Sequence, residues 1–122
     1  MKVAILGKVD QKGLSFLKEN EFKVIEIENF EIQNLKEQLK YVDGILLRTT
    51  KLDKENLEHC DNLKIISRHW VGYDNVDLDF LNENKIALCI TSTSNAVSVA
   101  EHVLSFFIYL TKKLSLSDSL VK

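Results

Sequence analysis

The feature that most constrains this 122-residue sequence is a repeated alternation of short apolar segments with segments of helical periodicity. Short apolar runs bounded by turn residues are typical of buried strands. The predicted strands are Lys2–Leu6, Phe22–Ile27, Ile45–Leu47, Leu63–Ser67 and Ile86–Ile90. The predicted helices are residues 11–20, Glu31–Leu39, Asp53–Cys60, Asp77–Asn84 and Asn95–Lys113. This order predicts an α/β fold, a five-stranded parallel sheet in a three-layer sandwich with helices on both faces.

Size and composition indicate an ordinary globular domain. A chain of 122 residues can bury a core without disulfides or metals, and we expect one domain over residues 1–122. The hydrophobic fraction of 45%, the charged fraction of 28% and the net charge of -2 fit that class. The near-neutral balance argues against a nucleic-acid-binding surface.

The sequence shows neither a membrane span nor a signal peptide. No stretch approaches about 18 uncharged apolar residues, and the apolar run after Met1 is too short for a signal peptide. Cys60 and Cys89 have no metal-ligand spacing, which suits a reducing compartment, and we expect the cytoplasm. His59 has no second ligand pair nearby, so no metal site is predicted. Cys89, in mid-strand, is expected in the core.

The predicted helix Asn95–Lys113 is apolar around most of its circumference. Its polar residues form one stripe: Ser98, Glu101, His102, Ser105 and Lys112. A surface helix needs an apolar band only a little over about 100° wide, so this helix is expected to contact protein on more than one side. A second domain or a second subunit would provide that contact. Asn95 is the expected N-cap, and Ser98 with Glu101 is an alternative capping box.

Ligands of open parallel sheets bind beyond the carboxyl ends of the strands. The predicted segments at that edge are Gly7–Gly13, Arg48–Lys51, Arg68–Asn75 and Thr91–Asn95. The first does not fit the phosphate-binding pattern GxxxxGK[ST], and no GxGxxG dinucleotide motif occurs in the chain. Gly7 is therefore interpreted as a turn glycine. The second segment offers a guanidinium, two hydroxyls and an ammonium to an anion, although a solvated loop fits as well.

The segment Arg68–Asn75 is the most unusual of these loops. Gly72 allows the backbone to approach a ligand closely, and successive N–H groups in such a turn can bind an anion. Trp70 and Tyr73 are candidate walls of a small pocket. The alternative is a tight turn with two aromatic side chains resting on the surface.

Three segments together resemble motifs of the D-isomer-specific 2-hydroxyacid dehydrogenases, the family of phosphoglycerate dehydrogenase, glyoxylate reductase and formate dehydrogenase. The segment Arg68–Asp77 resembles the family's R-x-x-[VI]-G-x-D-N-[IV]-D turn. Asn95–His102 matches its N-x-x-S-V-A-E-H helix start, and Leu47–Leu52 resembles its strand-end arginine, threonine and lysine. The order of strands and helices agrees over essentially the whole chain.

The resemblance implies a flavodoxin-like substrate domain that is followed by a Rossmann domain binding NAD or NADP. The implied substrate-binding residues are Arg48, Val71, Gly72, Tyr73 and Asn95, and the implied cofactor-binding residues are Thr50 and Val99. The family's catalytic arginine, acidic partner and histidine come from later in its chains, so no catalytic residue is assigned here. His102 is the histidine of the helix motif. Trp70 stands where a small residue is usual in the family.

The predicted function is therefore the substrate-binding portion of an NAD(P)-dependent D-2-hydroxyacid dehydrogenase, inactive by itself. Its partners would be a small 2-oxo or 2-hydroxy acid and a Rossmann domain, in cis or in trans. We expect no tight cofactor binding by this chain alone, a homodimer, and neither nucleic acid nor membrane as a partner. The alternative is a free-standing flavodoxin-like module that dimerises through its last helix.

Overall fold

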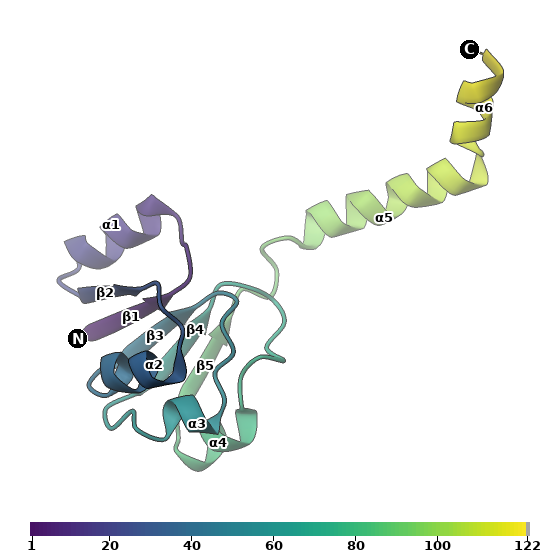
Figure 1. Ribbon diagram of the computed structural model, residues 1–122. Coiled ribbons are helices and arrows are strands. Elements are labelled where there is room, and N and C mark those ends of the chain that lie inside the picture. The colour runs from purple at the N-terminus through teal and green to yellow at the C-terminus, as the bar shows by residue number, and fades with distance from the viewer. Residues whose placement is uncertain (122) are drawn as a thin grey trace. The chain divides into compact units, whose positions relative to one another are not determined.

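The computed structural model describes residues 1–121. It contains two compact units: the sheet unit, Met1–Thr91, and the helical unit, which begins at Ser92. Figure 1 shows the strands and helices of both units.

The sheet unit is built on five parallel strands. They are β1 (Lys2–Leu6), β2 (Lys23–Ile27), β3 (Gly44–Leu47), β4 (Ile65–Arg68) and β5 (Ala87–Ile90). Their order across the sheet is β2-β1-β3-β4-β5, which is the order of flavodoxin-like folds. Every neighbouring pair is parallel, so the predicted sheet is confirmed.

Four helices connect the strands of this sheet. They are α1 (Gln11–Glu19), α2 (Ile32–Leu39), α3 (Lys54–Leu57) and α4 (Leu78–Glu83). Each lies within the segment predicted for it, but α3 is shorter than the predicted Asp53–Cys60. It ends early because the N–H of Cys60 bonds to the carbonyl of Leu57 at 2.9 Å, which closes a turn instead of continuing the helix.

Aspartates begin three of these helices: Asp10 begins α1, and Asp53 and Asp77 begin α3 and α4, as predicted. The side chain of Asp53 accepts a hydrogen bond of 3.3 Å from the N–H of Asn56, and that of Asp77 accepts one of 3.0 Å from the N–H of Phe80. These bonds satisfy backbone donors that have no partner inside a helix.

Helices α2, α3 and α4 lie on one face of the sheet and α1 lies on the other (Figure 1). The main core is under the three helices, where Leu39, Leu57 and Leu81 share one apolar cluster with Ile45 and Ile66 of the sheet. The predicted sandwich with helices on both faces is therefore confirmed.

The face that carries α1 is covered only in part. Leu14 of α1 and Ile5 of β1 are both buried there, whereas Cys89 of β5 is exposed. The prediction that Cys89 lies in the core is wrong. Strand β5 is at the edge of the sheet, and α1 is the only helix of the sheet unit on this face.

The helical unit consists of α5 (Ala96–Thr111) and α6 (Leu114–Val121). The predicted helix extended to Lys113, but that residue has a φ of 49°, which separates α5 from α6. No residue of α5 is buried, and Val97 and Phe107 are 71% and 64% exposed. None of the helices within residues 1–121 combines the length and apolar character that crossing a membrane requires.

Candidate functional site

The two arginines of the chain, Arg48 and Arg68, both lie at the carboxyl edge of the sheet. Arg68 is the last residue of β4 and is only 7% exposed. Its Nη1 donates a hydrogen bond of 2.6 Å to the carbonyl oxygen of Arg48, and its Nε donates to the carbonyl oxygen of Gly72. The buried guanidinium therefore connects the loop after β3 with the loop after β4.

Arg48 in turn connects the loop after β3 with the loop after β1. Its Nη1 donates to the carbonyl oxygen of Lys8 at 3.1 Å. Gly7 makes this approach possible, since an added Cβ would lie 3.1 Å from the Cβ of Arg48 and the φ of Gly7 is 103°. The interpretation of Gly7 as a turn glycine is confirmed.

The loops after β3 and β4 also contact each other directly. The side-chain amide of Asn75 donates a hydrogen bond of 2.7 Å to the carbonyl oxygen of Thr50, and Leu52 pairs with Val76 in an isolated parallel bridge. Within residues 1–121, Thr50 Oγ1 and Asn75 Oδ1 are buried oxygens without a hydrogen-bond partner. Buried polar atoms usually have partners, so these two oxygens indicate where a ligand or a water molecule would bind.

The backbone N–H groups of Val71 and Gly72 make no hydrogen bond within the described part of the chain. Gly72 does not have a left-handed φ, so the reason for a glycine here is space. An added Cβ would lie 3.1 Å from the carboxylate oxygen of Asp74. A side chain at position 72 would therefore crowd the carboxylate of Asp74.

The aromatic side chains of this loop point largely into solvent. Trp70 is 55% exposed and Tyr73 is 46% exposed, which agrees with the surface-turn alternative for the sheet unit by itself. Their role as pocket walls stays a prediction.

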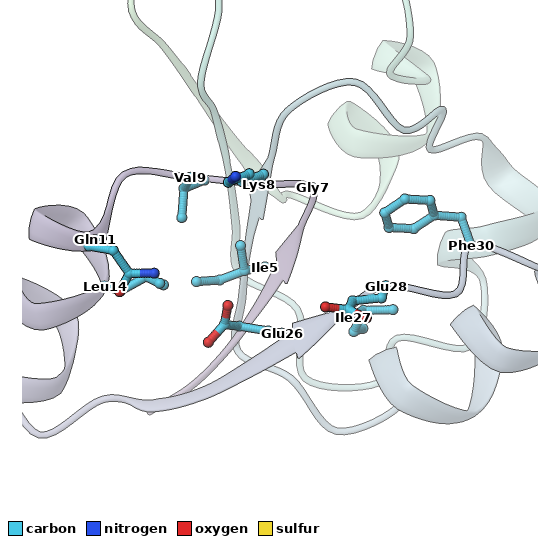
Figure 2. Close-up of a pocket in the computed structure, with 10 residues that line it drawn as sticks. All are labelled: Ile5, Gly7, Lys8, Val9, Gln11, Leu14, Glu26, Ile27, Glu28 and Phe30. Atoms are coloured by element: carbon cyan, nitrogen blue, oxygen red, sulfur yellow. The ribbon is translucent and has the colours of Figure 1, made fainter.

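Two hollows lie beside the carboxyl edge. One, of about 480 Å³, is lined by Lys8, Glu26 and Phe30 among others, and Figure 2 shows it between the loop after β1 and the end of β2. The other, of about 430 Å³, is lined by Phe30, Thr50 and Lys51 among others. Thr50 therefore borders an open space large enough for a small acid.

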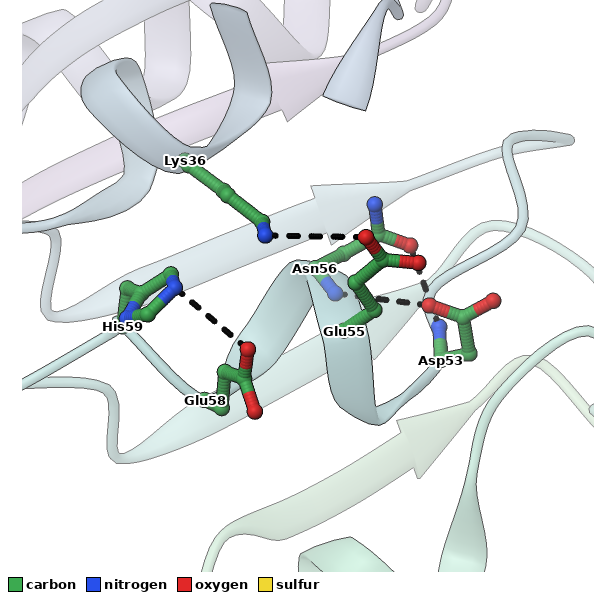
Figure 3. Close-up of polar contacts among 6 residues, drawn as sticks. All are labelled: Lys36, Asp53, Glu55, Asn56, Glu58 and His59. Carbon is green, nitrogen blue, oxygen red and sulfur yellow. Dashed lines mark hydrogen bonds and ion pairs between the residues drawn. The ribbon is translucent and has the colours of Figure 1, made fainter. Parts of the chain in front are cut away.

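The N-terminus of α3 adjoins the second hollow. Asp53 and Asn56 form a capping box in which each side chain accepts from the other's backbone N–H at 3.3 Å (Figure 3). The Nζ of Lys51 lies 3.4 Å from the carboxylate of Asp53, and that of Lys36 lies 3.6 Å from Glu55. These carboxylates have lysine partners. None of the ion pairs within residues 1–121 includes an arginine.

His59 and Cys60 lie at the far end of α3. The Nε2 of His59 is 3.4 Å from the carboxylate of Glu58 (Figure 3). Burial, helped by the charge of Asp61, raises the pKa of the Cys60 thiol to about 11. Among the described residues, no three His, Cys, Asp or Glu side chains are grouped closely enough to hold a metal ion.

Asn95 and Val99 belong to the helical unit. Asn95 takes the N-cap position of α5, as predicted, but its side chain makes no capping hydrogen bond. Its carbonyl oxygen accepts from the N–H of Val99 at 2.9 Å. Farther along α5, the rings of His102 and Phe106 are in edge contact, with their centroids 4.3 Å apart.

The sheet unit thus brings Arg48, Thr50, Val71 and Gly72 together on connected loops. Within residues 1–121 the two N–H donors are free and neither guanidinium has a carboxylate partner, an arrangement suited to binding a carboxylate. The sequence did not single out Arg68 as a functional residue. Two indications were available: its position as an arginine at the carboxyl end of a predicted strand, and its place as the first residue of the motif that Arg68–Asp77 resembles.

These features define a flavodoxin-like domain with unbonded N–H donors and two arginines at the carboxyl edge of its sheet. The catalytic domain of the D-isomer specific 2-hydroxyacid dehydrogenases matches residues 3–116, and the chain belongs to that family.

Individual relatives agree with this assignment. The chain is 30% identical to a putative 2-hydroxyacid dehydrogenase of Staphylococcus saprophyticus, in an alignment covering 100% of this chain. A crystal structure of the PH0520 protein from Pyrococcus horikoshii superimposes with a TM-score of 0.86 at 32% identity, over 98% of this chain. The NAD+-bound 3-phosphoglycerate dehydrogenase of Entamoeba histolytica has a TM-score of 0.75 at 28% identity, over 89% of this chain.

The match covers a minor part of each relative. The chain spans 40% of the staphylococcal protein, 36% of the Pyrococcus chain and 38% of the Entamoeba chain.

Proposed function

We propose that this chain is the substrate-binding portion of an NAD(P)-dependent D-2-hydroxyacid dehydrogenase. One observation carries the proposal: the free N–H groups of Val71 and Gly72 lie on a loop held by the buried guanidinium of Arg68. A 2-oxo or 2-hydroxy acid is ionised at neutral pH, and its carboxylate is the kind of acceptor that such donors bind.

In this proposal the sheet unit binds and orients the acid. The N–H groups of Val71 and Gly72 donate to the carboxylate, and Arg48 adds positive charge. Tyr73 forms a wall of the pocket, and Asn95 reaches the substrate. When an enzyme catalyses a reaction between two bound molecules, holding one of them in a fixed orientation can supply a large part of the rate enhancement.

The proposed cofactor is NAD or NADP, held by a Rossmann domain in cis or in trans. When bound, it would exchange a hydride with the acid. Thr50 and Val99 are the proposed contacts of this chain, and the unpartnered Oγ1 of Thr50 fits a polar group of a bound molecule. The chain contains no GxGxxG, so we expect neither tight cofactor binding nor catalysis by this chain alone.

Amide NMR of the ¹⁵N-labelled chain, titrated with sodium glycolate, tests acid binding. We expect saturable shifts centred on the amides of Val71 and Gly72, and much smaller shifts with uncharged glycolamide. Shifts that are absent, or spread evenly over the surface, would count against the proposal. A separate assay with NADH and glyoxylate should show no turnover, and any turnover dependent on the purified chain would refute the claim that the chain is silent alone.

We propose in addition that α5 mediates a homodimer, which is also how the alternative interaction module would act. The exposed apolar side chains of Val97, Leu104 and Ile108 support this, since they recur at helical spacing. Sedimentation equilibrium should show dimers that Leu104→Glu abolishes and that Lys112→Glu leaves intact. A wild-type chain that stays monomeric at every concentration would exclude the dimer.

Two further predictions concern the chain as a whole. That residues 1–122 form one domain would be tested by limited proteolysis, with a cut between Thr91 and Ala96 counting against it. A cytoplasmic location would be tested by cell fractionation.

A further inference from the structure

The orientation of the Gly72–Tyr73 peptide depends on Arg68. The described peptide bonds include no cis bond, so the C=O and N–H of each peptide unit point in opposite directions. The carbonyl of Gly72 accepts a hydrogen bond from Nε of Arg68. The N–H of Tyr73 must therefore point away from the guanidinium, and it makes no hydrogen bond within residues 1–121.

The Trp70–Val71 peptide is held in a comparable way. The carbonyl of Trp70 accepts from the N–H of Thr91 at 3.2 Å, so the N–H of Val71 points away from Thr91. Two carbonyls of the loop, those of Trp70 and Gly72, thus accept hydrogen bonds from residues at the sheet edge. The N–H groups of the same two peptides, those of Val71 and Tyr73, remain available.

Among the described residues, the charge of Arg68 has no neutralising partner. A guanidinium keeps its proton in a protein, and a buried cation is unfavourable unless it is paired. Arg68 is 7% exposed, and its described partners are the carbonyls of Arg48 and Gly72, which carry no net charge. A carboxylate bound at the loop would supply the missing negative charge.

We propose that Arg68 is the positioning residue of the acid site, a role that rests on the function proposed above. Its guanidinium turns the Tyr73 N–H toward the ligand as a third donor beside those of Val71 and Gly72. Its buried charge makes the site prefer a carboxylate over a neutral group of the same shape. Tyr73 would then contribute in two ways: its backbone N–H donates to the acid, and its ring forms the proposed wall of the pocket.

The test compares glycolate with glycolamide on the full chain, by calorimetry and amide NMR. The variants are Arg68→Gln, Arg68→Lys and the charge-matched control Lys18→Gln, which changes an exposed side chain of α1. We expect Arg68→Gln to weaken glycolate binding about tenfold or more and to lose most of the preference for glycolate. Arg68→Lys should bind glycolate more weakly but keep the preference for glycolate over glycolamide. Lysine retains the positive charge but lacks the planar guanidinium that donates to two carbonyls. Lys18→Gln should bind like the wild type.

The outcomes separate the two proposals. No saturable glycolate binding by the wild type would overturn the proposed function together with the role of Arg68 in it. Binding that Arg68→Gln retains, with an unchanged preference for glycolate, would overturn the role of Arg68 alone. If Arg68→Gln acted only by loosening the packing, it would weaken the binding of glycolate and glycolamide equally. That outcome would also overturn the role of Arg68.

If Arg68→Gln does not fold, Arg68→Lys decides. Weaker glycolate binding, with a shifted Tyr73 amide and a retained preference for the carboxylate, supports the proposal. Wild-type affinity and an unmoved Tyr73 amide contradict it.

Discussion

The side-chain amide of Asn75 donates a hydrogen bond of 2.7 Å to the carbonyl oxygen of Thr50, which lies 25 residues earlier in the chain. Backbone bonds lie beside this contact: Leu52 N–H donates to Asn75 at 2.9 Å, and Asp77 N–H donates to Leu52 at 3.1 Å. The loops after β3 and β4 are therefore paired like two short parallel strands, and we expect a change in one loop to displace the other.

Asn75→Asp should separate these loops. The variant replaces the donor with a carboxylate that faces the carbonyl of Thr50, and we expect a loss of about 1–3 kcal/mol in the free energy of unfolding. Urea unfolding measures the loss, and amide hydrogen exchange should become faster at Leu52. The control is Asn62→Asp at an exposed position, where a loss as large as that at Asn75 would contradict the explanation.

Gly7→Ala and Gly13→Ala should have opposite effects. At Gly7 the φ of 103° and the 3.1 Å approach to Arg48 predict a loss of more than about 1 kcal/mol. At Gly13, in α1, an added Cβ meets nothing within 4 Å, and we expect a gain of about 0.4–1 kcal/mol. Thermal unfolding of both variants compares them directly, and equal effects would show that the turn at Gly7 tolerates a side chain.

The two thiols should react at different rates. Cys89 is exposed, whereas Cys60 is partly buried and its pKa is raised to about 11. The thiolate is the reactive form, so Cys60 should react slowly at pH 8 and faster as the pH approaches 11. With a colorimetric thiol reagent we expect one fast and one slow phase. Cys89→Ser should remove the fast phase and Cys60→Ser the slow one. Similar rates for both thiols would be inconsistent with the burial of Cys60.

Asp43 should make stability depend on pH in the acid range. A hydrogen bond of 2.8 Å from the N–H of Lys2, followed by the ammonium of Lys64 at 3.0 Å, lowers the pKa of Asp43 from 3.8. A lowered native pKa contributes stability above the unfolded-state value, and this is lost as the pH falls through the native pKa. Asp43→Asn should therefore be less stable than the wild type at pH 7, and the difference should narrow below pH 3.8. Urea unfolding at several pH values checks this, and a pH-independent difference would contradict it.

The fold was predictable because its determinants are local patterns. Each apolar run corresponds to a strand of the sheet, and the caps Asp53 and Asp77 were readable from residue type alone. The exposure of Cys89 was not readable, because periodicity does not tell which strand lies at the edge of the sheet. The break at Lys113 was also missed, since a lysine with a left-handed φ has no sequence pattern.

The candidate site was predictable only in part. The free N–H groups of Val71 and Gly72 agree with the loop singled out by its glycine and aromatic residues. The role of Arg68 could not be derived, because it depends on which carbonyls its side chain reaches. One of those carbonyls belongs to Arg48, 20 residues away.

The arginine contacts also bear on folding kinetics. Arg48 bonds to Lys8 across 40 residues and Arg68 to Arg48 across 20, so these contacts of the proposed site require β1, β3 and β4 to be already aligned. Closing such long loops costs entropy that only the completed sheet offsets, and these contacts are expected to form late. Acid binding would then slow unfolding more than it speeds refolding, and a nascent chain would acquire affinity for the acid only after β4 has emerged and paired.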